Sequence, residues 1–487
     1  MDFLTTLVNA INSIIWSQYV LIPLLLLTGL YFTIKSRFLQ VRMLPEMIKS
    51  LTHKPEHVDE DAVSSFEAFT VGLASRVGTG NLAGVAIAIV IGGAGAVFWM
   101  WVVAILGSVS AFVESTLAQL YKVHDKEVKF RGGPAYYMRD GLGSKAMGVA
   151  FAILISLCFG LIFNAVQANT IVNAGASALA IEGFQTFAII AGICLVALAG
   201  YIFFSGTKKI AEFTSKMVPF MAMLYLLIAA LVIVIRFRDI PEVFAMIISG
   251  AFSPDAAFGG AIGITLIQGI KRGLFSNEAG MGSAPNAAAS ADTDHPVRQG
   301  LIQSFGVYID TLVICSATAF IILVSGIELD PSATDGISVT MNALAEVVGN
   351  WSIYFLLIAI FFFAFSSILG NYYYAQSNIE YLSEKESSVR NFKLVVLAMV
   401  MFGSVASSDL VWALADLFMG SMAILNIIAI LRLNKQAFFL LDDYESQLKE
   451  GKNPVFDSAK YEDYSHFEIW NSETNGMVSE ENQEFEV

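Results

Sequence analysis

The main pattern in the sequence is a series of long apolar stretches separated by short polar connections. A helix that crosses a bilayer needs about 20 mostly apolar residues, and windows of that length predict eleven such spans. We place them at 14–34, 66–92, 95–121, 147–180, 186–206, 213–236, 258–284, 299–326, 351–377, 393–407 and 410–432. Only 14% of the residues are charged and 56% are hydrophobic, whereas soluble domains are roughly 25% charged. The sequence therefore predicts an all-α polytopic membrane protein.

The basic residues predict the orientation of the spans. The connections after the odd-numbered spans, together with the C-terminal segment, carry 23 of the 28 Lys and Arg residues. Because Lys and Arg are enriched in cytoplasmic loops, we expect the N-terminus outside and the C-terminus in the cytoplasm of a plasma or inner membrane. Residues 1–435 form the predicted membrane domain, and residues 436–487 form a predicted acidic, solvated tail.

Two of the apolar spans are interrupted by glycine-rich, polar sequence. The second span contains GLASRVGTGNLAG (72–84), and the seventh contains QGIKRGLFSNEAGMGSAP (268–285). An offset of five spans makes the two helices cross in opposite directions. Interrupted helices at corresponding positions of two halves are typical of inverted-repeat transporters. We therefore predict repeats at 66–236 (spans 2–6) and 258–432 (spans 7–11), with 14–34 as a peripheral helix.

A break in a membrane helix predicts a binding site. Unwound backbone in hydrocarbon leaves groups unsatisfied at several kcal/mol each, unless they line a cavity or meet a ligand. Half-helix N-termini favour anions and C-terminal carbonyls favour cations. One broken helix therefore suits a zwitterionic amino acid together with a small cation. The alternative for Gly80 and Gly84 is close helix packing through a GxxxG motif.

Other classes of protein are less consistent with the sequence. The three cysteines lie in apolar spans without a CxxC pair, and the five histidines are scattered in polar connections, so we expect no metal site and no cofactor. An enzyme would need a nucleophile–base or metal constellation. A channel would need continuous polar pore-lining faces, which the mostly apolar spans do not provide. We expect a carrier that acts as a monomer in lipid, without a nucleic-acid partner.

Three motifs resemble the alanine/glycine:cation symporter family. They are RVGTGNLAGVAIAIVIGGAGAVFWMW (76–101), FRGGPAYYM (130–138) and RGLFSNEAGMGSAP (272–285), and the likeness extends over roughly residues 15 to 435. That family has the leucine-transporter architecture. The resemblance therefore implies a five-plus-five inverted repeat, and uptake of small neutral amino acids coupled to sodium or, alternatively, to protons.

The resemblance also implies where the substrate binds. The backbone N–H groups of Thr79, Gly80 and Asn81 would hold the substrate carboxylate, with the Asn81 amide either joining the site or capping the half-helix. The corresponding fourth span of the family contributes a glutamine, which is Gln167 here. In the seventh span, the second half of the predicted site comprises Gln268, Gly269, Gly273 and Phe275.

The predicted sodium site lies in the ninth span. In leucine-transporter-like proteins an adjacent hydroxyl pair on this helix joins carbonyls of the first broken helix around the ion. The resemblance thus implies Ser366, Ser367 and the Val77 carbonyl as ligands. Sodium is favoured over protons because no span contains a histidine as an obvious proton carrier. The alternative is that both hydroxyls bond back to their own helix.

The chain departs from the family pattern at two positions. Arg76 stands directly before the break, and Asn371 stands where members associated with alanine and glycine carry tryptophan. Asn371 follows Ser367 by one helical turn, so it is predicted to face the same cavity. An amide in place of a ring enlarges the pocket and favours glutamine over alanine and glycine. Arg76 and Glu278 are candidates for a gating ion pair, a purely structural pair being the alternative.

Overall fold

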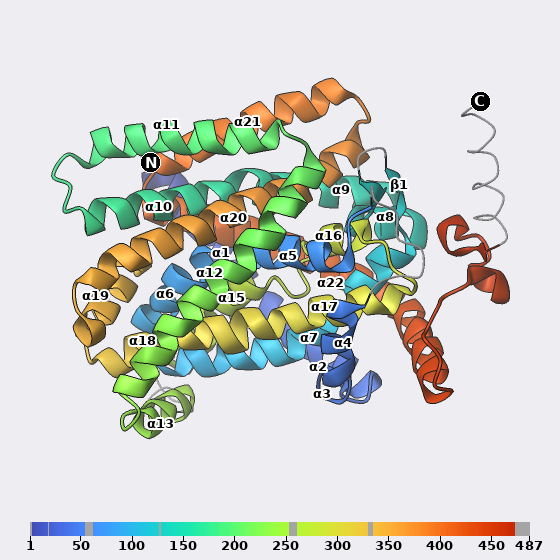
Figure 1. The fold of residues 1–487 in the computed structure, drawn as a ribbon, viewed down its shortest axis with the longest axis horizontal. Coiled ribbons are helices and arrows are strands. Elements are labelled where there is room, and N and C mark those ends of the chain that lie inside the picture. The colour runs from blue at the N-terminus through green and yellow to red at the C-terminus, as the bar shows by residue number, and fades with distance from the viewer. Residues whose placement is uncertain are drawn as a thin grey trace.

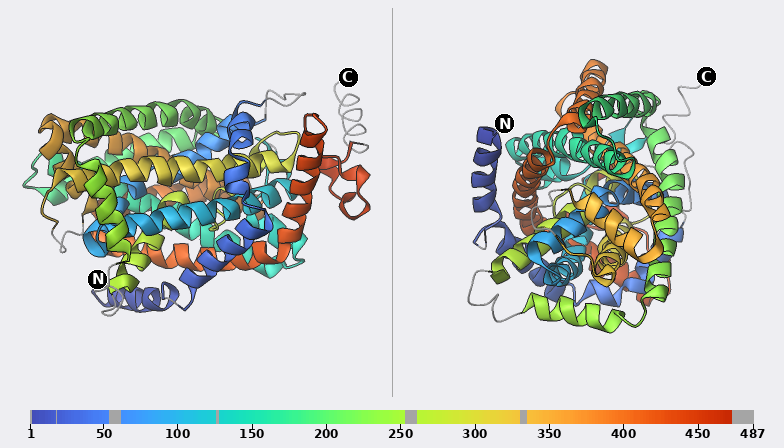
Figure 2. Two further views of the ribbon diagram at one scale, coloured as in Figure 1. Left: turned by 90° about the horizontal axis from the view of Figure 1, so that it is seen from below. Right: turned by 90° about the vertical axis from the view of Figure 1, so that its left-hand side faces the viewer.

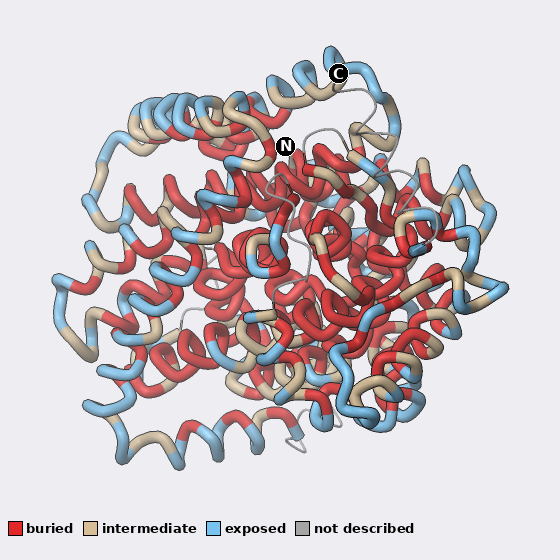
Figure 3. Tube along the Cα trace, turned by 45° about the vertical axis from the view of Figure 1, so that its right-hand side comes forward, coloured by how far each residue is buried: buried red, intermediate tan, exposed pale blue. Residues whose placement is uncertain are grey.

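The computed structural model describes residues 2–17, 19–53, 62–125, 128–252, 261–329 and 335–472. Most long helices lie along the long axis of the molecule (Figure 1). Buried residues fill the interior, and the exposed residues lie mainly on the outer helices and connections (Figure 3). The predicted all-α membrane protein is confirmed.

Within the described residues, eight helices are long and apolar enough to cross a membrane, or nine if one bent pair counts as a single span. All eight correspond in order to predicted spans 3 to 6 and 8 to 11. Their bounds are α7 (Gly95–Leu120), α9–η3–α10 (Lys145–Ile155, Ser156–Phe163, Asn164–Ala178), α11 (Phe184–Phe203), α12 (Thr207–Ile235), α17–η4–α18 (Pro296–Val307, Tyr308–Cys315, Ser316–Ser325), α20 (Trp351–Leu382), α21 (Glu386–Val405) and α22 (Ser408–Lys449).

The bent pair is the predicted second span. Its first half is α5 (Ser65–Arg76), which begins with a capping box between Ser64 and Glu67. After the break the chain continues as the π-helical turn η1 (Gly80–Gly84) and as α6 (Val85–Gly92). The two halves are inclined at 48°. The interruption predicted from the glycines is therefore present in the structure.

The seventh span breaks later than the sequence predicts. Helix α15 (Ala261–Asn277) is continuous, and a turn separates it from α16 (Pro285–Ser290). The turn contains left-handed residues at Glu278, Gly280 and Gly282, which ends the helix because ordinary side chains disfavour that region. The predicted span residues 258–260 lie outside the described residues.

The peripheral helix predicted at 14–34 is instead two helices, α1 (Asp2–Ile15) and α2 (Leu21–Lys35). Helix α1 contacts the start of α22, where Asn12 Nδ2 donates to the Ala413 carbonyl at 2.8 Å. Several elements were not predicted from the sequence, because they are too short to cross a bilayer. These are α3 (Leu39–Arg42), α4 (Leu44–Thr52), β1 (Val123–Asp125), β2 (Lys129–Arg131), α8 (Pro134–Tyr136), η2 (Tyr137–Gly141), α13 (Ile240–Ala251) and α19 (Gly336–Val348).

One end of the molecule gathers the connections that were predicted to be cytoplasmic. The β1–β2 hairpin, α3, α4, α8 and the C-terminal segment lie at this end, and α13 and α19 lie at the other (Figure 1). The N-terminus lies toward the end opposite the C-terminus (Figure 2). The structure therefore agrees with the predicted alternation of the spans, whereas the absolute orientation stays a prediction.

The C-terminal segment differs from the predicted solvated tail. Helix α22 continues past the predicted boundary at 435 to Lys449, and residues 453–471 then fold back in short turns, η5 (Ser458–Lys460), η6 (Glu462–Tyr464) and η7 (Glu468–Trp470). Trp470 Nε1 donates to the Gln119 carbonyl at 3.1 Å, and Phe456 N–H donates to the Asp294 carbonyl at 2.9 Å. These contacts anchor the segment to the ends of the membrane helices. Residues 473–487 lie outside the described residues.

Candidate functional site

The centre of the site is Gly78, in the break between α5 and η1. A Cβ atom at Gly78 would lie 2.2 Å from Ser367 Oγ and 3.0 Å from Gln167 Oε1. Only a residue without a side chain fits between these two groups. The break, α10 and α20 therefore meet at one point, as predicted for residues far apart in the sequence.

Gln167 binds the backbone of the break directly. Its Oε1 accepts a hydrogen bond from Thr79 N–H at 3.1 Å and another from the Thr79 hydroxyl at 2.6 Å. The structure thus brings the glutamine predicted in the fourth span to the predicted carboxylate site. The same bond occupies one of the N–H groups assigned to the substrate. A carboxylate that takes this N–H must displace the Gln167 carbonyl.

The two serines predicted to bind sodium face different neighbours. Ser367 Oγ lies 2.8 Å from the Ala74 carbonyl, 3.5 Å from the Val77 carbonyl and 3.0 Å from the carbonyl of Phe363 in its own helix. Ser366 Oγ instead bonds to the Phe363 carbonyl at 2.9 Å and lies 3.7 Å from the sulfur of Met221. Of the two serines, only Ser367 places its hydroxyl near the Val77 carbonyl, whereas the Ser366 hydroxyl bonds back to its own helix.

The Asn81 side chain caps the break, which was the alternative to substrate contact. Its Oδ1 accepts from Gly78 N–H at 2.8 Å, and its Nδ2 donates to Asp310 Oδ1 at 2.6 Å. Asp310 Oδ2 also accepts from the hydroxyls of Ser276 and Thr311, at 2.8 and 2.7 Å. The site selection from sequence omitted Asp310 and Ser276. An acidic residue inside an apolar span is the signal that could have indicated Asp310, because such residues are costly in a bilayer.

Phe275 forms an apolar wall beside the break. A Cβ atom at Gly80 would lie 2.9 Å from Cδ1 of Phe275, and the Phe275 ring lies 4.6 Å from the ring of Phe163 and 4.7 Å from that of Trp412, between centroids. Gly80 therefore lies in the predicted site and also packs closely against a neighbouring helix, so both interpretations of this glycine apply. Aromatic packing of this kind closes the pocket on one side.

The other three residues predicted in the seventh span lie within the continuous helix α15. Cβ atoms at Gly269 and Gly273 would meet α7, at 2.4 Å from the Ala96 carbonyl and 2.6 Å from Val103 Cγ1. Gln268 lies beside Gly92, and its buried Oε1 has no hydrogen-bond partner. Their backbone is helical in this conformation, because the unwound turn begins only at Glu278, and their contact with the substrate stays a prediction.

The candidate gating charges do not form an ion pair in the described part of the chain. Arg76 Nη1 donates to the Gln303 carbonyl at 3.2 Å, and Glu278 bonds to the hydroxyls of Ser75 and Ser283, each at 2.6 Å. A separate cluster of charged residues lies against Trp412, where the guanidinium of Arg272 is 4.7 Å from the ring centroid. Its acid is in α22 and its two bases are in α15. There Asp416 Oδ2 contacts Lys271 Nζ at 3.2 Å and Arg272 Nη2 at 3.0 Å.

Asn371 lies next to the break and is fully buried. Its Nδ2 donates to Asn164 Oδ1 at 3.1 Å, and its Oδ1 lies 2.6 Å from Ser75 Oγ. Thr79, Asn81 and Ser367 also have no exposed surface. The site is therefore closed to solvent in this conformation.

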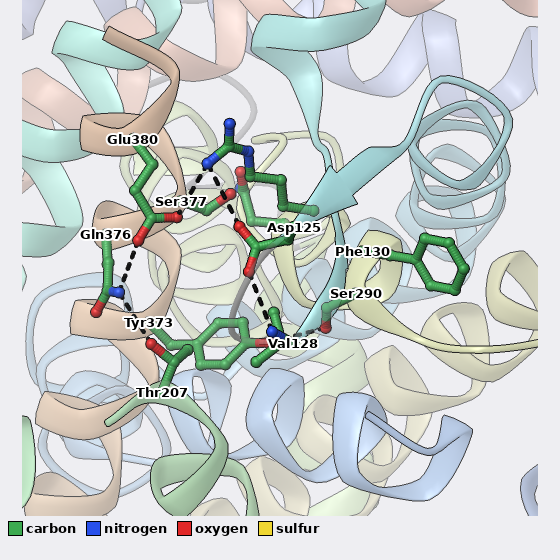
Figure 4. Close-up of a pocket in the computed structure, with 11 residues that line it drawn as sticks. Asp125, Val128, Phe130, Thr207, Ser290, Tyr373, Gln376, Ser377 and Glu380 are labelled. Carbon is green, nitrogen blue, oxygen red and sulfur yellow. Dashed lines mark hydrogen bonds and ion pairs between the residues drawn. The ribbon is translucent and has the colours of Figure 1, made fainter. Parts of the chain in front are cut away.

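Polar side chains line a pocket beside the β-hairpin and bond to one another (Figure 4). Arg131 contacts Asp125 at 3.3 Å and Glu380 at 3.7 Å, so it ties β2 to the end of α20. Gln376 Nε2 donates to Glu380 at 2.7 Å, and Tyr373 OH donates to Ser290 in α16 at 2.8 Å. These contacts hold α20 against β2 and α16.

Comparison with known proteins identifies the family of the chain. The profile of the sodium:alanine symporter family matches residues 1–458. A Bacillus subtilis protein described as the probable sodium/glutamine symporter GlnT is 50% identical over 470 residues, which cover 96% of each chain. The sodium/alanine symporter AgcS of Methanococcus maripaludis is 38% identical over 441 residues, covering 89% of this chain and 95% of AgcS.

The fold has a counterpart among solved structures. The crystal structure of MhsT in complex with L-phenylalanine superposes with a TM-score of 0.54 and 14% sequence identity, covering 78% of this chain and all of MhsT. The leucine-transporter architecture that the family resemblance implied is thus confirmed. The chain belongs to the sodium:alanine symporter family, whose members are membrane transporters and not enzymes.

Proposed function

We propose that this protein is a sodium-coupled symporter for small neutral amino acids, and that it prefers glutamine to alanine and glycine. One observation carries the proposal: oxygen ligands for a cation and N–H donors for an anion meet at a single helix break. Ser367 Oγ lies near the carbonyls of Ala74 and Val77, and Thr79 N–H lies two residues further along the same break.

Sodium binds at Ser367 in this proposal. Hydroxyl and carbonyl oxygens are hard ligands, and carbonyls of unwound helix segments coordinate coupling ions in transporters of this kind. Val77 and Ser367 are the principal ligands, while Ser366 needs a rotamer change to contribute, because its hydroxyl is bonded to the Phe363 carbonyl. The coupling ion and the substrate then share the backbone of residues 77–79, so each organises the site of the other.

The amino acid binds beside the ion, with its carboxylate at the N–H groups of Thr79, Gly80 and Asn81. Gln167 holds the Thr79 N–H in the structure and moves aside when the substrate arrives. Phe275 contacts the apolar part of the ligand, because it already packs against Gly80. The Lys271–Arg272–Asp416 cluster closes one side of this site.

The preference for glutamine rests on Asn371. An asparagine amide has two N–H groups and a carbonyl with two lone pairs, and the bonds to Asn164 and Ser75 use one of each. The remaining donor and acceptor suit the side-chain amide of glutamine. Leaving a buried polar group unpaired costs about 1–3 kcal/mol, which is roughly tenfold or more in affinity. The similarity to GlnT supports this choice.

The topology completes the proposal. The end with the β-hairpin and the C-terminal segment faces the cytoplasm, and the N-terminus faces the outside. Uptake then proceeds by opening the Asp416 cluster to the outside and the Arg131–Glu380 network to the cytoplasm in alternation. The monomer suffices, because the residues assigned to the site all come from one chain.

Uptake into proteoliposomes tests the proposal. Purified protein is assayed with glutamine, alanine and glycine while external sodium is exchanged for lithium or choline, and then with a proton gradient alone. We expect saturable, sodium-dependent uptake with glutamine ahead of alanine. Uptake driven equally well by protons without sodium would contradict sodium coupling, and unsaturable flux would indicate a channel.

A variant tests the selectivity separately. Asn371→Trp is expected to reverse the order of glutamine and alanine, because the ring fills the space and removes the amide. Both substrates are measured on both proteins at saturating sodium. If the unmodified protein takes up alanine as well as glutamine, the assignment of Asn371 is wrong, while sodium-coupled symport stands on the ion-exchange result.

A further inference from the structure

A continuous chain of hydrogen-bonded side chains crosses the centre of the protein and includes a carboxyl group that the proposed function does not use. It connects η3, α10, α20, α5 and the turn after α15. The members and their separations are Gly160 O to Asn164 Nδ2 (3.0 Å), Asn164 Oδ1 to Asn371 Nδ2 (3.1 Å), Asn371 Oδ1 to Ser75 Oγ (2.6 Å), Ser75 Oγ to Glu278 Oε1 (2.6 Å) and Glu278 Oε2 to Ser283 Oγ (2.6 Å).

The direction of the chain is fixed at the Gly160 end. A backbone carbonyl only accepts hydrogen bonds, so Asn164 must turn its NH₂ group to Gly160 and its Oδ1 to Asn371. Asn371 must then donate to Asn164 through Nδ2 and present Oδ1 to Ser75. Reversing either amide would place two acceptor oxygens against each other.

Ser75 therefore has an acceptor on one side and a carboxyl oxygen on the other. A hydroxyl has one proton to donate, and Ser75 gives it to Asn371. The 2.6 Å contact between Ser75 Oγ and Glu278 Oε1 then needs a second proton, because two unprotonated oxygens at that separation repel each other. Glu278 is the one partner in this contact that can carry it.

We infer that Glu278 is a proton-binding site of this transporter, that it carries a proton in the closed conformation, and that it releases this proton when the chain of hydrogen bonds breaks. The inference rests on the proposed function and adds a titrating site to it. The step is balanced as loss of H⁺ from the carboxylic acid to water, leaving a carboxylate.

The surroundings provide a place for the carboxylate that forms. Arg76 of α5 is buried, and its Nε and Nη2 have no hydrogen-bond partner. The other ionisable groups that interact electrostatically with Glu278 are Asp310 of η4, Cys158 of η3 and Tyr374 of α20. Because Arg76 is the only cation among these described groups, it is the partner expected for Glu278 after proton release.

The backbone conformation of Glu278 is unusual for a glutamate. Glu278 has φ 59°, in the left-handed region, and its N–H donates to the Leu274 carbonyl at 2.9 Å, so it ends α15. Glycine or asparagine usually occupies such a position, and other residues are strained there. A strained glutamate that the surrounding contacts hold in place is consistent with a working group.

Glu278→Gln is the decisive variant, because a glutamine reproduces the protonated acid. Its Nε2 donates to Ser75 and its Oε1 accepts from Ser283, while no proton can leave. In the infrared spectrum of purified protein at neutral pH, we expect a carboxylic-acid carbonyl band in the unmodified protein that is missing in Glu278→Gln. Glu346→Gln, on the exposed face of α19, is the matched control and should retain the band.

Glutamine binding as a function of pH gives the second readout. The closed conformation holds the proton, so its population should fall as pH rises, by up to about tenfold per pH unit, and binding should change with it. Glu278→Gln should bind glutamine with little dependence on pH. An infrared band that persists in Glu278→Gln, or a variant with the pH profile of the unmodified protein, would overturn the inference.

Ser75→Ala covers the case in which Glu278→Gln does not fold. Removing the hydroxyl deprives the acid of its acceptor, so the carbonyl band of the acid should shift, and an unshifted band contradicts the inference. The infrared readout needs neither sodium nor transport. A failure of sodium coupling in the proteoliposomes would therefore be distinguishable from a failure at Glu278.

Discussion

Replacing Gly78 with alanine is the sharpest test of the break as the sodium site. The added Cβ would lie 2.2 Å from Ser367 Oγ and 3.0 Å from Gln167 Oε1, whereas ordinary contacts begin at 3.4 Å. The φ of Gly78 is outside the left-handed region, so alanine meets no backbone strain there. The substitution therefore acts through its side chain alone, and it acts mainly on Ser367.

The size of the expected loss in sodium affinity follows from the contacts that Ser367 loses. Turning away from the methyl group breaks its hydrogen bond to the Ala74 carbonyl, which is worth about 0.5–1.5 kcal/mol. Residual overpacking costs about 1–3 kcal/mol. A combined loss of about 2–4 kcal/mol corresponds to a fall in sodium affinity of about 30-fold to several hundred-fold.

The assay is the sodium concentration for half-maximal glutamine uptake, with the sodium-induced rise in unfolding temperature as a transport-free measure. Gly84→Ala is the matched control, because its Cβ would meet nothing closer than Trp412 at 3.7 Å, and we expect it to behave as the unmodified protein. If Gly78→Ala folds and keeps the sodium dependence of the unmodified protein, the ion does not bind between Ser367 and the break.

Three further predictions concern other contacts. Ser367→Ala should raise the sodium concentration needed for uptake at least about tenfold, as expected for about 1.4 kcal/mol. Ser366→Ala should change it little, because the Ser366 hydroxyl bonds to its own helix. Equal effects of the two substitutions would show that both serines bind the ion. Trp470→Ala should lose about 3–5 kcal/mol of packing and expose the C-terminal segment to limited proteolysis, while Trp351→Ala, at a 53% exposed position, should not. Burial lowers the pKa of His295 below its ordinary 6.5 in the folded protein. The free energy of unfolding that His295 contributes is therefore fully present above pH 6.5 and is lost as pH falls through the lower folded-state pKa. The unfolding temperature should be lower at pH 5 than at pH 7, and His295→Asn should remove this difference.

The membrane helices were predictable from the sequence because their signal is long and local. Windows of apolar residues located α7, α9–α10, α11, α12, α17–α18, α20 and α21 to within about seven residues at each end, together with the start of α22, since a bilayer requires both length and apolarity. The break at 77–79 was predictable as well, because GTGN combines helix-breaking and polar residues. The start of the second break was not, because Gly269 and Gly273 serve helix packing, and single glycines do not distinguish packing from unwinding.

The side-chain partners within the site were less predictable. Gln167 and Ser367 were selected by the resemblance to a family, and the structure places both at Gly78. The roles of Ser75 and Asp310 depend on which helices adjoin, and neither residue has a local pattern that reveals this. Ser75 bonds to α20 and to the turn after α15, both more than 200 positions away in the sequence, a relation that periodicity within one helix cannot show.

The docked C-terminal segment has a consequence for how the protein is made. Residues 453–471 are the last described part of the chain to leave the ribosome, yet they supply the partners of Arg298 and of the Gln119 carbonyl. Until translation reaches them, the end of α7 and the start of α17 have to rely on water for these bonds. Assembly of this end of the molecule is therefore a late event, and a nascent chain stalled before residue 453 would hold its membrane helices without these contacts. Ribosome-bound intermediates of defined length would show the order directly.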